Sequence, residues 1–310
     1  MSKQGSGGSE GRATGKVVFI DGAPFEPEAA TVSVYDRGFL YGDAVFEVLR
    51  TYRGEPFALG EHVARLRRSA ERVFIDLPLD DASMQGEIER AIAATHNEES
   101  YVRVVVTRGA GPLSLDPATA RRPLRVILVE PIFPLAREPY ADGVAAVTVA
   151  TRRSADDTTA AGAKVTNYLE SLIAVREATA RGAVEALIVN GRGEVVEGAT
   201  SNVFAVKGGR VTTPPEGAGI LAGITRAHVL AAAVRLGVPV DEQTLRPESL
   251  YVADEVFITS SIRELMPVVR VDDRTIGAGR PGPVARTLHR AFRVAVGLGD
   301  RPMPWEERAP

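Results

Sequence analysis

A proline-rich segment at residues 131–143 divides this chain into two halves, each of which alternates between expected strands and helices. The segment holds three prolines and ends in the turn pair Asp142-Gly143, a composition typical of a linker between domains. With 310 residues the chain is long enough to form two hydrophobic cores. The sequence therefore predicts a disordered tail at 1–15, a small N-terminal domain at 16–131, a linker at 132–143, a larger domain at 144–300 and a polar tail at 301–310.

Apolar periodicity indicates the elements of each half. In the first half it predicts strands at 17–20, 32–34, 44–49, 102–107 and 124–129, and helices at 59–74 and 80–95. In the second half it predicts strands at 144–150, 186–189, 203–206, 210–212 and 255–259, and helices at 225–236 and 283–296. Elements interleaved in this way are typical of an α/β or α+β fold.

The composition argues against several kinds of partner. Lysine and arginine number 37 against 40 aspartate and glutamate residues, so the net charge of −3 gives no reason to expect nucleic acid or an anionic membrane. The sequence has neither an apolar run long enough to span a bilayer nor the apolar core of a signal peptide. The absence of cysteine predicts a cytoplasmic protein without disulfides, and the four scattered histidines predict no metal site.

Lys164 stands at the start of a stretch with a helical apolar rhythm, in which Leu169, Leu172 and Ile173 recur on one side. If the helix begins at this lysine, Tyr168 lies four residues further on the same face. A lysine amine is a weak nucleophile at its ordinary pKa of about 10.4. In a dry pocket or beside cations that pKa falls, and the amine can form a Schiff base with an aldehyde. In this stretch alone, an ordinary surface lysine before a helix would look the same.

Other segments carry groups that could complete a site around this lysine. Glu197 ends a predicted strand before glycine and small polar residues, and residues 221–226 open a helix whose free N–H groups could bind an anion. Residues 257–263 run from a strand into a serine-rich turn, which could be a second anion site. Arg65 lies on the polar side of the helix at 59–74. Each of these features also occurs in ordinary turns, capped helices and solvated helix faces.

Six segments match one protein family in order and spacing. They are Tyr41–Glu47, Glu61–Leu66, Lys164–Leu169, Glu197–Phe204, Leu221–Arg226 and Val256–Pro267. The chain resembles the class IV, or fold-type IV, aminotransferases that use pyridoxal 5′-phosphate, and among them the branched-chain amino acid aminotransferases. The resemblance runs from about Val17 to Val296 and implies the two-domain fold of that family, with the cofactor bound by the larger domain.

The resemblance also implies a role for each cofactor-side residue. Lys164 is expected to bind pyridoxal 5′-phosphate covalently and to move the proton of the reaction. Glu197 is expected to face the pyridine nitrogen, and Tyr168 the phenolic oxygen of the ring. The phosphate is expected to contact Arg65, Ile224, Thr225, Ser260 and Ser261.

On the substrate side the resemblance is less complete. Tyr41, Phe46, Tyr101 and Arg103 match substrate-side residues of the family, and the backbone N–H groups of Ser261 and Ile262 match its α-carboxylate donors. Arg103 could instead be a strand arginine paired with an acid. The chain departs from the common pattern at Val48, Thr200 and Ile262-Arg263, where smaller residues are usual, so the size of the pocket stays open.

The function implied is a homodimeric or larger transaminase. It would move an amino group between an L-amino acid, preferably branched-chain and aliphatic, and a 2-oxo acid such as 2-oxoglutarate, by a ping-pong mechanism. D-amino acid aminotransferases of this family bind the carboxylate with an Arg-x-His pair just after a Thr-Arg-Gly turn. Here the positions after Thr107-Arg108-Gly109 hold Leu113 and Leu115, which favours the L-enantiomer.

Three alternatives remain open. A lyase similar to aminodeoxychorismate lyase is one, because Asp36-Arg37-Gly38 and Phe46-Glu47-Val48 resemble that subgroup equally well. A D-amino acid or (R)-amine transaminase is the second. The third is a cofactor-free binding protein on the same fold, against which the presence of both Lys164 and Glu197 argues.

Overall fold

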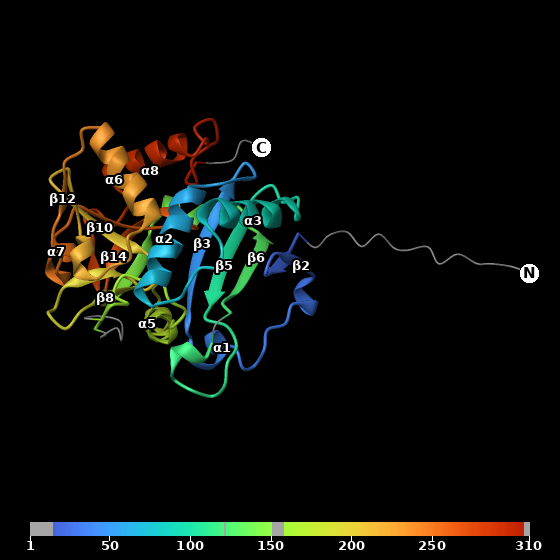
Figure 1. The fold of residues 1–310 in the computed structure, drawn as a ribbon. Helices are drawn as coiled ribbons and strands as arrows, with labels where there is room; N and C mark the ends of the chain where they lie inside the picture. Colours follow the sequence, from blue (N-terminus) through green and yellow to red (C-terminus); the bar gives the residue numbers. More distant parts are fainter. Residues whose placement is uncertain (1–14, 121, 151–157, 307–310) are drawn as a thin grey trace, which may run out of the picture.

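The structure is a computed structural model that describes residues 15–120, 122–150 and 158–306. The predicted tails at 1–15 and 301–310 lie outside the described residues except for Gly15 and residues 301–306. Two β-sheets, one from each half of the chain, form the centre of the fold, with helices packed against them (Figure 1). This mixed arrangement agrees with the α/β and α+β prediction.

The first sheet is antiparallel throughout, with the strand order β2-β1-β6-β5-β3-β4. Its strands are β1 (Val17–Ile20), β2 (Ala23–Phe25), β3 (Ala44–Tyr52), β4 (Glu55–Pro56), β5 (Ser100–Thr107) and β6 (Leu124–Pro131). Helices α2 (Leu59–Arg72) and α3 (Asp81–Ala93) cover one face, where Leu66, Met84 and Val104 are among the buried core residues (Figure 1). The short helix α1 (Arg37–Tyr41) precedes β3.

The second sheet is mixed, with the strand order β12-β11-β10-β13-β14-β7-β8-β9, and β15 pairs with β14. Its strands are β7 (Val144–Ala150), β8 (Glu185–Val189), β9 (Val195–Gly198), β10 (Asn202–Lys207), β11 (Arg210–Thr213), β12 (Val240–Glu242), β13 (Glu255–Ser260), β14 (Glu264–Val271) and β15 (Arg274–Thr275). The helices of this half are α4 (Glu138–Ala141), α5 (Leu169–Ala180), α6 (Ile224–Arg235), α7 (Pro247–Tyr251) and α8 (Pro283–Ala295).

The two halves meet along β3. At its far end Tyr52 enters the core of the second half, where its ring centroid lies 6.4 Å from that of Phe292. Near its start Val45 forms an isolated antiparallel bridge with Val165. The segment that contains Lys164 is therefore attached to the first sheet, although it belongs to the second half of the chain.

Two local expectations were wrong. Residues 32–34 form no strand; the chain turns there, and the backbone N–H of Tyr35 donates to the Ser33 hydroxyl. The helix near the lysine begins only at Leu169, because Val165 is held in an extended bridge to β3. Its apolar rhythm also does not mark the buried face, since Leu169, Leu172 and Ile173 are exposed while Ala174 and Ala178 are buried.

The segment expected to be a linker has structure of its own. It contains α4, and Tyr140 within that helix is buried. The Tyr140 hydroxyl donates a hydrogen bond of 2.8 Å to the carbonyl oxygen of Arg263, in the turn between β13 and β14. Of the expected C-terminal tail, Met303 is also buried.

Candidate active site

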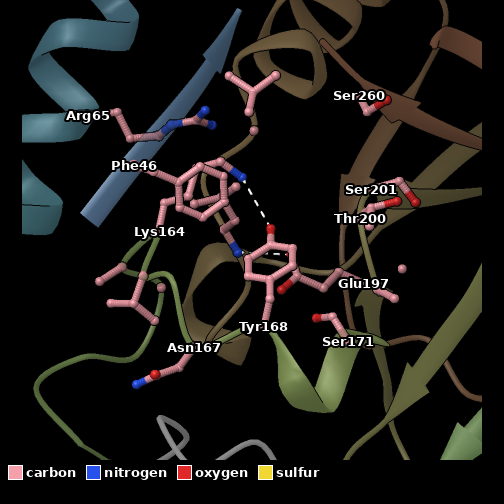
Figure 2. Close-up of a pocket in the computed structure, with 18 of the residues that line it drawn as sticks. Phe46, Arg65, Lys164, Asn167, Tyr168, Ser171, Glu197, Thr200, Ser201 and Ser260 are labelled. Carbon is pink, nitrogen blue, oxygen red and sulfur yellow. Dashed lines mark hydrogen bonds between the residues drawn. The ribbon is translucent and has the colours of Figure 1, made fainter. Parts of the chain in front are cut away.

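A cavity of about 750 Å³ is lined by residues from both sheets. Every residue that the sequence analysis assigned to cofactor or substrate is part of its wall: Tyr41, Phe46, Arg65, Tyr101, Arg103, Lys164, Tyr168, Glu197, Ile224, Thr225, Ser260, Ser261 and Ile262. Figure 2 shows Phe46 and Arg65 on one side of this pocket and Glu197, Thr200 and Ser260 on the other, with Lys164 and Tyr168 between them.

The backbone around Lys164 is fixed by hydrogen bonds to the first half of the chain. Its N–H donates to the hydroxyl of Ser69 at 3.1 Å, and its carbonyl oxygen accepts from the N–H of Phe46 at 2.9 Å. The side chain points into the cavity, where Nζ lies 3.5 Å from the hydroxyl of Tyr168 (Figure 2). The expected lysine–tyrosine contact is therefore present, but the extended segment and the helix start produce it rather than a shared helix face.

The surroundings of Lys164 favour a reactive amine. Burial and the nearby positive charge of Arg65 lower its pKa to about 8, against the opposing effect of Glu47 and Glu197. A larger share of the amine is therefore neutral, and able to attack an aldehyde, than in a solvated lysine. Tyr168 behaves oppositely, because burial and the charge of Glu197 raise its pKa to about 12. Tyr168 thus remains a hydrogen-bond donor.

Glu197 is buried near the end of β9 and is not a solvated turn residue. Its Oε2 accepts from the backbone N–H of Leu221 at 3.0 Å and from the Asn202 side-chain amide at 3.5 Å. The same amide donates to the carbonyl oxygen of Leu221. The carboxylate is therefore held at the wall of the cavity by the segment that precedes α6.

Arg65 is held by a buried ion-pair network that the sequence analysis did not assign. Its Nε and Nη2 each donate to Glu47 at 2.7 Å, and Nη1 donates to the carbonyl oxygen of Ala222 at 2.8 Å. His62 Nδ1 lies 2.8 Å from the same carboxylate. Burial alone would raise the pKa of Glu47, but Arg65 and His62 hold it at about 2. The side chains of His62, Arg65 and Ser69 are thus part of the buried structure, not of a solvated face of α2.

Anion donors gather at the start of α6 and in the turn after β13. Gly223 caps the helix without a side-chain hydrogen bond, which leaves the first-turn N–H groups of a 12-residue helix available beside the buried Thr225. A side chain at Gly223 would collide with Asn202, whose Oδ1 lies 1.9 Å from the position of an added Cβ. Ser260 and Ser261 line the same cavity. With Arg65, these groups form a binding site suited to a phosphate.

On the substrate side, Arg103 stacks its guanidinium 4.2 Å from the centre of the Phe46 ring. Within the described parts of the chain Arg103 has no acidic partner, so the alternative of a strand arginine paired with an acid finds no support. Val48 and Ile262 add apolar surface to the cavity wall. Leu113 and Leu115 are absent from that wall and are strongly exposed.

Two classes of site were not found. Residues 15–120, 122–150 and 158–306 contain no group of three His, Cys, Asp or Glu side chains placed to hold a metal ion. Among the helices that these residues form, none has the length and apolar character needed to cross a membrane.

Known proteins of similar sequence identify the family of this chain. Residues 44–271 match the family described as amino-transferase class IV. The chain is 39% identical, over 276 residues, to a protein of Methanocaldococcus jannaschii named provisionally as a branched-chain-amino-acid aminotransferase, with 89% of this chain and 95% of that protein covered. It is 33% identical over 281 residues to the D-alanine aminotransferase of Bacillus licheniformis, with 90% and 96% covered.

Solved structures extend the similarity to three dimensions. The branched-chain amino acid aminotransferase of Escherichia coli matches with a TM-score of 0.87 at 31% identity and covers 93% of this chain and 97% of that one. Another branched-chain amino acid aminotransferase of similar structure was solved with pyridoxamine 5′-phosphate. The lysine amine, the anion donors and the buried carboxylate of this cavity suit pyridoxal 5′-phosphate, which class IV aminotransferases use. On this combined evidence the chain belongs to the class IV aminotransferases, as an enzyme with pyridoxal 5′-phosphate as its cofactor.

Proposed function

We propose that this aminotransferase moves the amino group of L-branched-chain amino acids to a 2-oxo acid such as 2-oxoglutarate by a ping-pong mechanism. The observation that carries the proposal is the pairing of Phe46 with Arg103 in the cavity wall. An aromatic ring beside Val48 suits an aliphatic side chain. A guanidinium without an acidic partner in the described residues suits the second carboxylate of 2-oxoglutarate. The one cavity could therefore accept both substrates in turn.

The cofactor-side residues have separate tasks in this proposal. When bound, pyridoxal 5′-phosphate supplies an aldehyde for the amino group and an electron-withdrawing ring. Lys164 would hold the cofactor covalently and, as a free amine once the substrate amine has replaced it, would take the proton from the substrate Cα. Glu197 would compensate the positive charge of a protonated pyridine nitrogen, and the hydroxyl of Tyr168 would donate to the phenolic oxygen of the cofactor.

The phosphate is held by charge and by backbone donors. Arg65 has two N–H hydrogens left after its bonds to Glu47 and Ala222, and these are available to the phosphate. The hydroxyl of Thr225 and the first N–H groups of α6 supply neutral donors, together with Ser260 and Ser261. The substrate α-carboxylate binds to the backbone N–H groups of Ser261 and Ile262.

A D-amino acid transaminase is the second candidate, because a D-alanine aminotransferase is among the relatives. The positions expected to hold a carboxylate-binding pair in such an enzyme are Leu113 and Leu115, which have no hydrogen-bonding side chain. This favours the L-amino acid assignment.

We also propose that the enzyme is a cytoplasmic homodimer. Large apolar side chains are exposed on segments that border the cavity, namely Phe39, Leu169 and Leu172. Leu113 and Leu115 are exposed on the loop that Arg37 holds. A second copy of the chain would remove this surface from water. Sedimentation should give twice the mass of the chain, and a monomer at micromolar concentration would contradict the proposal. The cytoplasmic location is supported by the absence of cysteine.

The deciding experiment is a set of single-turnover reactions without acceptor. The holoenzyme is mixed with L-leucine, L-isoleucine or L-valine, and the 2-oxo acid released is measured. One equivalent of the matching 2-oxo acid, with full turnover only after 2-oxoglutarate is added, is the expected result. Pyruvate from aminodeoxychorismate without any amino acceptor would instead indicate the lyase, and (R)-1-phenylethylamine tests the amine transaminase.

A further inference from the structure

A second buried carboxylate lies close to the cavity, on a residue to which no role has been assigned so far. Glu185, the first residue of β8, has no exposed surface. Its Oε2 accepts hydrogen bonds from the hydroxyls of Thr200 at 3.0 Å and Ser201 at 2.9 Å and from Nη2 of Arg263 at 2.8 Å. Oε1 accepts from the N–H of Ala186. A buried anion with this many donors, one of them charged, is fully compensated.

These donors come from two separate turns of the cavity wall. Thr200 and Ser201 follow Glu197 in the turn between β9 and β10, whereas Arg263 lies in the turn between β13 and β14. Arg263 also contacts the hydroxyl of Thr200 directly. Figure 2 shows Thr200 and Ser201 side by side near Glu197. Glu185 and Arg263 thus join the turn beside Glu197 to the turn that contains Ser261 and Ile262.

The backbone at Gly198 packs closely against this junction. A Cβ added at Gly198 would lie 2.2 Å from Oγ of Ser201 and 3.0 Å from Cδ of Glu185. The backbone of Arg263 is fixed as well, because its carbonyl oxygen accepts from Tyr140 and its N–H donates to the Ser260 hydroxyl at 3.2 Å. Arg263 is therefore held at both ends, by its backbone in the turn between β13 and β14 and by its guanidinium at Glu185.

The turn fixed in this way offers unused donors to the cavity. Within residues 15–120, 122–150 and 158–306, the N–H groups of Ser261 and Ile262 donate no hydrogen bond, although both residues line the cavity. Arg263 stands directly after them in the chain, so a change in its side-chain anchor would alter the direction of these N–H groups. The charge of Arg263 is compensated by Glu185, which makes it a poor anion-binding group itself.

We propose that the Glu185–Arg263 ion pair positions the N–H groups of Ser261 and Ile262 for the substrate carboxylate. Both are positioning residues that act through the turn, and Thr200 completes the link. The inference rests on the proposed function in one respect, namely that this turn binds the carboxylate. Thr200 and Arg263, two of the positions at which the chain departs from the common family pattern, are thereby explained together.

The test separates carboxylate binding from the rest of the reaction. The probes are 4-methylpentanoate, which has the carboxylate and side chain of leucine without its amine, and 3-methylbutylamine, which has the amine without the carboxylate. Binding of the acid to the holoenzyme is measured by calorimetry, and reaction of the amine by single-turnover kinetics. Arg263→Met should weaken binding of the acid about tenfold and leave the rate with the amine within about twofold of wild type.

Further variants distinguish positioning from direct contact. If the two residues act as a unit, Glu185→Gln should weaken acid binding as much as Arg263→Met does. The double variant should then bind the acid only slightly more weakly than either single variant. Arg263→Lys should recover part of the affinity. The control Arg210→Met removes an exposed arginine paired with Asp241 and should change neither the affinity for the acid nor the rate with the amine. Because the double variant leaves no charge buried alone, it also keeps the test valid if a single variant folds poorly.

Three results would overturn the inference. Unchanged acid affinity in Arg263→Met would remove the pair from carboxylate binding. Tighter or equal binding in Glu185→Gln, with loss only in Arg263→Met, would mean that Arg263 contacts the carboxylate itself. If a variant lowers the affinity for the acid and the rate with the amine by the same factor, the substitution has damaged the active site in general. If the wild-type enzyme does not react with branched-chain amino acids, the proposed substrate is wrong and the inference is not affected. The test is then repeated with the acid and the amine that correspond to the amino acid the enzyme accepts.

Discussion

The amine of Lys164 lies 4.6 Å from the centre of the Phe46 ring. The face of an aromatic ring attracts a cation, whereas burial in the cavity disfavours one, and burial is the largest cause of the lowered pKa of the amine. Phe46 therefore supports the position of the side chain without preventing loss of its proton. The same ring carries the guanidinium of Arg103 at 4.2 Å, so one residue orders both the lysine and the substrate-side cation.

Replacement of Lys164 by alanine should abolish covalent cofactor binding and reduce transamination by several orders of magnitude, because nucleophile and proton carrier are lost together. Borohydride treatment of the wild-type holoenzyme should leave the cofactor attached to the peptide that contains Lys164, as measured by mass spectrometry. Lys207, whose side chain is 67% exposed, is the matched control. Label on Lys207 or Lys16 would contradict the assignment.

The lowered pKa of Lys164 predicts how cofactor attachment depends on pH. Since only the neutral amine attacks an aldehyde, attachment to the apoenzyme should accelerate as the pH rises towards about 8 and level off above it. A solvated lysine would continue to gain reactivity up to about pH 10.4. Stopped-flow absorbance after addition of pyridoxal 5′-phosphate measures this rate. An attachment rate that keeps rising between pH 9 and 10 would show that the pKa of the Lys164 amine is not lowered.

Glu197→Gln should fold and bind the cofactor, yet lose much of the rate of proton removal from the substrate. A neutral amide cannot stabilise a protonated pyridine nitrogen as a carboxylate does. The amide oxygen can still accept from Leu221, so the local structure should survive. Single-turnover kinetics with deuterated and undeuterated leucine isolate the proton step. An unchanged rate would mean that Glu197 serves only to hold the segment before α6.

Arg65→Ala and Thr225→Ala should both weaken cofactor binding, and Arg65→Ala should weaken it more. A hydrogen bond to a charged donor contributes about 1.5–3 kcal/mol, against about 1 kcal/mol for a neutral hydroxyl. Among the described residues, removal of Arg65 also leaves the buried Glu47 with His62 as its remaining side-chain partner. Equilibrium dialysis gives the affinities, and pyridoxal, which lacks the phosphate, is the control ligand. Equal affinities in wild type and Arg65→Ala would remove Arg65 from the phosphate site.

Most elements of the fold were predicted by apolar periodicity, and the errors have physical reasons. No strand was predicted at the position of β14, whose sequence contains Pro267, and a proline normally argues against a central strand. This proline nevertheless pairs with Phe257 in a strand between β13 and β7, just before a register shift at Val268 and Arg270. The leucines of α5 led to a different error. Their helical spacing predicts a buried face, but in the structure they are exposed and do not face the core of this chain.

The residues of the cavity wall could be predicted where the family resemblance named them one by one, whereas ion pairs between residues distant in sequence could not. Glu47 appears in the sequence only as a charged residue in an apolar strand, and its partner Arg65 is 18 residues away. Glu185 and Arg263 are separated by 78 residues. A buried charge inside an apolar strand is itself a signal that a partner exists, but the sequence does not identify the partner.

The last prediction is stereochemical. Leu113 and Leu115 occupy the positions at which D-amino acid aminotransferases of this family are expected to carry carboxylate donors. In the structure their side chains are 72% and 79% exposed. The backbone of their loop is held by Arg37, which donates to the carbonyl oxygens of Ser114 and Leu115. At these two positions the loop can therefore offer apolar surface but no side-chain donor to a carboxylate.

We therefore propose that the carboxylate binds at the turn of Ser261 and Ile262, whose N–H groups donate no hydrogen bond within the described residues. With the carboxylate there and the aliphatic side chain against Phe46, the substrate should present the Cα proton of the L-enantiomer to Lys164. L-leucine, L-isoleucine or L-valine should therefore release 2-oxo acid faster than D-alanine or D-glutamate in single-turnover reactions, with 2-oxoglutarate as a competent acceptor. (R)-1-phenylethylamine, which needs no carboxylate site, is the control for pocket size. A clear preference for D-amino acids in the same reactions would reverse the assignment, and would require that the carboxylate binds near Leu113 and Leu115 through groups other than their side chains.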